Sequence, residues 1–79
     1  MDIKVHNFIT DGDNKQITLE VLYNSQVFIV TKDIPVVSDK TTEQYVADAL
    51  AASQTEINSW KSDTVSVGKK FNAETGSFI

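Results

Sequence analysis

The sequence lacks both cysteine and arginine, and each absence removes a class of chemistry. Without cysteine, neither a disulfide nor a thiolate-bound metal can stabilise the chain. Its 79 residues must therefore rely on one thin apolar core, helped by a partner subunit if there is one. Arginine is the preferred bidentate ligand of phosphate and guanine. All seven basic residues are lysines and 11 residues are acidic, for a formal charge of −4, so we expect no nucleic-acid partner.

Long hydrophobic runs are also missing. The longest is the four-residue stretch 27–30, which is far too short to span a bilayer, and the acidic balance disfavours an anionic membrane surface. The beginning, MDIKVHNF, has no basic region followed by an apolar run, so we expect no secretory signal. These features predict a single soluble domain over residues 1–79 with no membrane contact.

Three stretches of the first half alternate between apolar and polar residues, which predicts β-strands over residues 2–10, 16–23 and 27–34. In the first, we expect Ile3, Val5 and Ile9 on one face and Phe8 on the other. The second alternates most cleanly, although Leu22 interrupts its polar face. The third is apolar on both faces at first, so we expect it to be a central strand that ends at Pro35.

Short turn sequences separate these strands. The sequence Asp11-Gly12-Asp13-Asn14 joins the first two, and Asn24-Ser25 joins the second to the third. Glycine, aspartate and asparagine tolerate the backbone conformations that tight turns require. The three segments are therefore predicted to form an antiparallel meander.

One amphipathic helix is predicted over residues 41–61. Thr41 and Gln44 have the spacing of a capping box at its start. The predicted buried stripe recurs at intervals of four and three residues. Its members are Val46, Leu50, Ser53, Ile57 and Trp60.

The residues after the helix return to a β pattern. Residues 64–67 are predicted to be a short strand, and residues 72–76 a tight loop with Gly76 at its left-handed position. The chain then ends in a hairpin or in a single strand with a short hook. The predicted fold class is therefore α+β: a three-stranded meander, one helix, and a C-terminal strand or hairpin. A ferredoxin-like strand order is the alternative.

The acidic residues form no recognisable metal motif. A calcium loop beginning at Asp11 would need glycine at its sixth position and glutamate at its twelfth, but those positions hold Gln16 and Leu22. A second group of acids, Asp33, Asp39 and Glu43, lies around the helix start. We expect such acids to cap turns and to complement the helix dipole, and a carboxylate cluster for metal binding or acid–base chemistry is the alternative.

No catalytic constellation is visible either. His6 is the only histidine, and the chain has no cysteine and no nucleophile-elbow motif to accompany it. We expect His6 to face solvent beside Lys4 and Phe8. We therefore expect a protein that is not an enzyme and has no cofactor or metal.

The last third supplies the candidate interaction residues, which are Trp60, Lys69, Lys70 and Phe71. Aromatic residues dominate interface hot spots, but in so small a domain we expect Phe71 and Phe78 to be needed for the core. For Trp60 a core position and a rim position are equally expected, because it belongs to the buried stripe but lies at the helix end. Lys69 and Lys70 are too few for a nucleic-acid patch. On a strand they would guard an exposed edge, and an acidic partner is the alternative.

The C-terminal pattern, Trp60 followed by VGKKFN at 67–72 and TGSF at 75–78, resembles the ending of many small phage-encoded proteins associated with tails or virions. The resemblance covers roughly the last 20–25 residues and transfers no catalytic residue. It implies a virion accessory component, an assembly factor or a modulator of a host protein.

Two functions follow as expectations. The first is a non-enzymatic phage structural or accessory protein that acts through protein–protein contacts, with itself as a homo-oligomer or with a larger phage component. The second is an acidic inhibitor that negative charge steers to a basic host protein. The expected location is the virion or the host cytoplasm.

Overall fold

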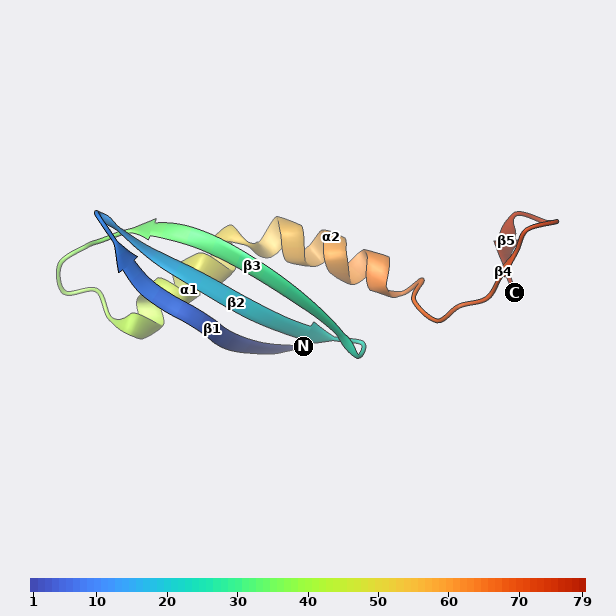
Figure 1. The fold of residues 1–79 in the computed structure, drawn as a ribbon, viewed down its shortest axis with the longest axis horizontal. Helices are drawn as coiled ribbons and strands as arrows, with labels where there is room; N and C mark the ends of the chain where they lie inside the picture. The colour runs from blue at the N-terminus through green and yellow to red at the C-terminus, as the bar shows by residue number, and fades with distance from the viewer.

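The computed structural model describes all of residues 1–79 and contains a three-stranded antiparallel sheet, two helices and a small C-terminal hairpin (Figure 1). The strands are β1 (Asp2–Asp11), β2 (Asn14–Tyr23) and β3 (Gln26–Pro35), and the helices are α1 (Thr42–Ala52) and α2 (Gln54–Thr64). The hairpin consists of β4 (Phe71–Asn72) and β5 (Ser77–Phe78). The predicted α+β class and the meander are confirmed.

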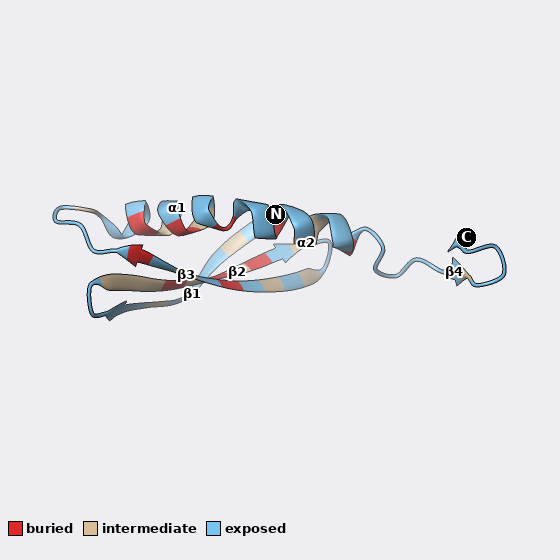
Figure 2. Cartoon of the chain, turned by 90° about the horizontal axis from the view of Figure 1, so that it is seen from above, coloured by how far each residue is buried: buried red, intermediate tan, exposed pale blue.

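The core lies between one face of the sheet and the two helices, which run along it (Figure 2). From β2, the alternating residues Ile17, Leu19 and Val21 are fully buried. From the helices, Tyr45, Ala49, Ser53 and Ile57 follow one another at four-residue intervals and are also buried. The small side chains of Ala49 and Ser53 let the helices approach the sheet closely.

The register of β1 departs from the predicted alternation. A bulge between Val5 and Asn7 leaves His6 without a partner in β2. The extra residue reverses the alternation, so Phe8 pairs with Ile17 on the helix side and Ile9 falls on the opposite face. The prediction that Ile9 shares a face with Ile3 and Val5 is therefore wrong.

β3 is an edge strand, because β2 occupies the centre of the sheet. The prediction of a central strand is wrong, although Pro35 does end the strand. Val30 and Ile34 face the helices and are buried, whereas Val27 and Ile29 face the other way and are exposed. The apolar character of both faces therefore reflects an uncovered surface.

The helical region is two helices, not one. The capping box at Thr41 is confirmed, since its hydroxyl accepts from the Gln44 amide and the Gln44 side chain accepts from the Thr41 amide. The interruption falls at Ser53, whose hydroxyl donates to the Ala49 carbonyl at 2.7 Å. A serine bonded back to the preceding turn bends a helix. Of the predicted stripe, Ser53 and Ile57 are buried, and the other three members are half-buried.

Residues 64–67 are not a strand. Thr64 is the last residue of α2, and its hydroxyl donates to the Lys61 carbonyl. Single turns continue through Val67, whose amide donates to the Thr64 carbonyl. Threonine and valine favour strands, but here residues 64–67 continue the helix in single turns, so the local context overrides their β propensity.

Residues 65–79, here called the arm, extend beyond the body formed by residues 1–64 (Figure 1). The molecule measures 59 × 17 × 16 Å and its radius of gyration is 16.8 Å. A compact domain of this length would have a radius of gyration of about 12 Å. Of the two predicted endings, the hairpin is the one that forms, but it lies away from the core.

Candidate protein-binding surfaces

The sheet face that points away from the helices carries apolar side chains that nothing covers. We call this surface the outer face. Its exposed hydrophobic residues are Ile9, Leu22, Val27 and Ile29. Leu22 pairs with Val27 across β2 and β3, and Ile29 lies two residues further along β3. Leu22, Val27 and Ile29 form a continuous apolar strip at one end of the sheet, whereas Ile9, which pairs with Gln16, lies toward the other end.

A half-open hollow of about 300 Å³ lies at this end of the outer face. Leu22 and Val27 give it an apolar floor, and Asp2, Lys4 and Glu20 surround them. His6, in the bulge of β1, lies 3.8 Å from Glu20, measured from Nδ1 to Oε2. An apolar floor with a mainly acidic rim is suited to an apolar side chain accompanied by positive charge.

The arm ends in an ordered hairpin built around Asn72. The Asn72 side-chain oxygen accepts from the amides of Glu74 and Thr75, and its carbonyl accepts from the Gly76 amide at 2.8 Å. Gly76 has φ +70°, a conformation that favours glycine, as the sequence predicts. The loop is thereby closed by hydrogen bonds within the arm itself.

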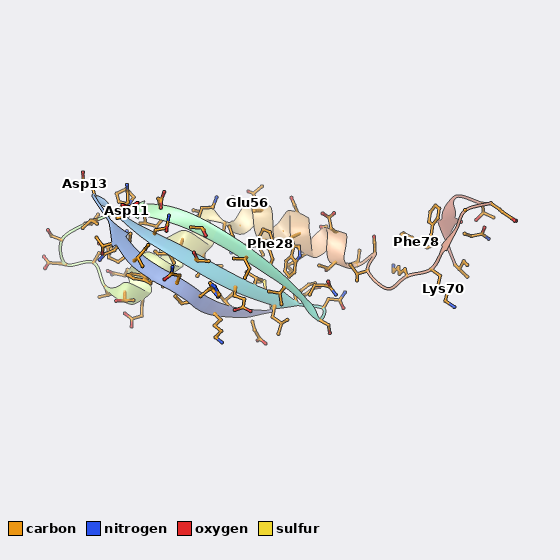
Figure 3. All side chains as sticks on the ribbon, viewed as in Figure 1. Asp11, Asp13, Phe28, Glu56, Lys70 and Phe78 are labelled. Atoms are coloured by element: carbon orange, nitrogen blue, oxygen red, sulfur yellow. The ribbon has the colours of Figure 1, made fainter.

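The two phenylalanines of this hairpin are exposed, which contradicts the expectation that they fill the core. Phe71 and Phe78 pair across the hairpin and pack edge to face, with ring centroids 5.8 Å apart. Nevertheless, 58% of Phe71 and 52% of Phe78 remain exposed. The side-chain view places Phe78 and Lys70 on the arm, far from the sheet (Figure 3).

Trp60 belongs to the body and not to the arm. Its ring stacks on Phe28 with centroids 5.3 Å apart and meets Tyr23 edge to face at 6.3 Å. Lys61 lies over the Tyr23 ring. The half-buried Trp60 therefore closes one end of the packed layer, and the structure does not bring it together with Lys69, Lys70 and Phe71.

Lys69 and Lys70 precede the hairpin and lie outside both of its strands. The prediction that they guard a sheet edge is wrong for this reason. The Lys69 ammonium lies 5.6 Å from the centroid of the Phe78 ring, within the range of a cation–π contact. The arm thus combines two positive charges with two exposed aromatic rings.

The predicted acidic candidates remain apart. Asp33 lies on β3, Asp39 in the connector before α1, and Glu43 in the first turn of α1. No three His, Cys, Asp or Glu side chains come close enough to hold a metal ion. Glu43 occupies the first turn, where a negative charge complements the helix dipole.

The outer face was not predicted as a candidate site, although its signals are present in the sequence. Leu22 interrupts the polar face of β2, and Val27 and Ile29 make the beginning of β3 apolar on both faces. Either observation fits a covered strand or an uncovered one. The position of the helices, which contact β2 and β3 from one side only, decides between them.

Comparison with protein-family models, with curated protein sequences and with solved structures gives no match for this chain. Neither helix has the length and apolar character needed to traverse a lipid bilayer.

Proposed function

We propose that this protein is a non-enzymatic binding protein of a phage, a virion or tail component or an assembly factor, that acts through protein–protein contacts. The observation that carries the proposal is the amount of accessible surface that the fold leaves uncovered. A compact monomer of this mass would expose roughly 4,800 Å². The chain exposes 5456 Å², an excess of about 700 Å² relative to that expectation.

The excess surface is of a kind that protein partners cover. Exposed phenylalanines on the arm and exposed branched residues on the outer face are typical of interface centres. Both outer strands of the sheet, β1 and β3, also have unpaired edges that can accept a further strand. The phage setting rests on the resemblance of residues 60–78 to the endings of small tail- and virion-associated proteins.

The proposal is tested by fractionating a lysate of the phage that encodes this chain. Particles are banded in a density gradient and probed with an antibody against the chain. We expect the chain in the particle band or in tail-assembly intermediates, with a fixed stoichiometry. A chain found only as free protein, absent from both fractions, would contradict the proposal.

A basic host protein is the alternative partner. The observation that favours it is the charge of the body, because residues 1–64 hold ten acids and five lysines, for a formal charge of −5. A complex with one basic host protein that forms at low salt and dissociates at high salt would favour inhibition over assembly.

A further inference from the structure

We infer that the arm of one chain docks on the outer face of a second copy, so that two chains exchange arms in a reciprocal dimer. This inference rests on the proposed function and names the partner as the chain itself. Phe71 and Phe78 would lie on the strip formed by Leu22, Val27 and Ile29. Lys69 and Lys70 would lie near the acidic rim that includes Asp2 and Glu20.

The arm needs a partner because its hairpin is too small to be stable alone. β4 and β5 contain two residues each. An isolated two-stranded hairpin is at best marginally stable in water, and packing against another surface is what stabilises it. Its hydrogen bonds and the Phe71–Phe78 contact are nevertheless formed. The hairpin is therefore already folded for binding, and the body of the same chain does not cover it.

Charge favours the outer face as the acceptor. Residues 65–79 hold two lysines and one glutamate, a formal charge of +1, whereas the body carries −5, and together these give the −4 of the whole chain. Within the hollow, Asp2 and Glu20 outnumber Lys4. Opposite charges around an apolar contact fix its orientation and exclude like-charged surfaces.

The positions of the two surfaces suit an exchange. The arm begins where α2 ends, and the Asn24 side chain donates to the Thr64 carbonyl there. Leu22 and Val27 flank the same β2–β3 turn, so the hollow and the base of the arm share one end of the body. Two bodies that meet at these ends can each receive the other's arm under a two-fold axis.

The surface area is also sufficient. If docking lowers the accessible surface of each chain to that of a compact monomer, each chain loses about 700 Å² and a dimer buries roughly 1,400 Å² in total, within the range of about 1,200–2,000 Å² for stable interfaces. Reciprocal docking covers the arm and the outer face of both chains at once. It leaves no unsatisfied copy of either surface, so the assembly closes.

Engineered cysteines test the contact directly, because the chain has none of its own. One full-length variant, Ser77→Cys, places a thiol on the arm, and a second, isotope-labelled variant, Thr31→Cys, places one on the outer face. The mixture is treated with a short bismaleimide, and the mixed product is quantified by mass spectrometry. In the matched control, Thr55→Cys on the exposed side of α2 replaces Thr31→Cys.

We expect the mixed product with Thr31→Cys to exceed that with Thr55→Cys at least tenfold. Equal yields would overturn the inference.

In a second experiment, the double variant Phe71→Ser/Phe78→Ser is expected to raise the dissociation constant of the dimer by about 100-fold or more, because two interface anchors are lost. Its circular dichroism should stay unchanged, because both residues lie outside the core.

Self-association that survives this double substitution would also overturn the inference, as would a wild-type chain that is monomeric at every concentration. Either result leaves the proposed function standing if the chain still bands with phage particles. Loss from the particle and assembly fractions, with dimerisation and cross-linking intact, would remove the proposed function and keep the arm exchange.

Discussion

Leu19 and Leu22 show how one strand divides its residues between two environments. Leu19 is 0% exposed and packs in the core, whereas Leu22 is 43% exposed on the outer face. Both are leucines of β2, and they are separated by only three positions. Replacing each with alanine therefore compares burial with exposure at constant chemistry.

We expect Leu19→Ala to lower the free energy of unfolding by about 2–5 kcal/mol, because it leaves a cavity against the helices. Leu22→Ala should change it by no more than about 0.5 kcal/mol in a monomeric chain. Urea unfolding at low protein concentration measures both. Equal losses in the two variants would mean that the outer face is covered within one chain.

The alternation of β2 correctly predicts which residues form the core, because a period of two assigns alternate side chains to opposite faces. The assignment of Ile9 fails because a bulge shifts the pattern by one residue, and nothing in the local sequence marks His6 as its site. The prediction that β3 is a central strand, based on apolar residues such as Val27 and Ile29, fails for another reason. An apolar residue on a strand does not reveal whether anything covers it.

The start of α1 is defined by local side-chain chemistry. Thr41 and Gln44 satisfy each other's backbone amides. Thr41→Ala should therefore destabilise the protein by about 1 kcal/mol, which lowers the melting temperature by roughly 4–8 °C. Thermal denaturation followed by circular dichroism measures the shift.

Thr42→Ala is the matched control, because Thr42 is exposed and is the first helical residue after the cap. Alanine has the higher helix propensity, so the melting temperature should stay the same or rise slightly. A loss as large as that of Thr41→Ala would show that the capping box does not stabilise the helix start.

At the level of elements, the beginning of the helix was predictable and its interruption and end were not. A capping box is a local signal, and Thr41 carries it in the sequence. The bend at Ser53 depends on a buried hydroxyl that bonds to Ala49, and the burial follows from tertiary packing. The strand predicted at 64–67 reflects propensity alone, which helix continuation overrides.

The whole molecule consists of a small packed body and an arm that its own core does not hold. The sequence predicts the arm's loop correctly, since Asn72 and Gly76 specify it locally, and the hairpin is one of the two endings that it allows. It does not predict where the hairpin lies, because an exposed Phe71 and a buried one share the same pattern. Only the radius of gyration and the exposure of the arm separate the two cases.

The separation of arm and body affects how the stability of the chain depends on the arm. Because the arm contributes nothing to the core of its own body, unfolding of the body should not depend on the arm in the isolated chain. In a dimer, each docked arm would link the stability of the body to protein concentration. The association state therefore distinguishes a chain that exchanges arms from one whose arm stays free.

Multi-angle light scattering of the full chain, measured across a wide range of concentrations, reports the association state directly. We predict that the mass doubles from 8.8 kDa as concentration rises and then stays constant, because arm exchange closes the assembly. A mass of 8.8 kDa at every concentration would contradict arm exchange between two chains.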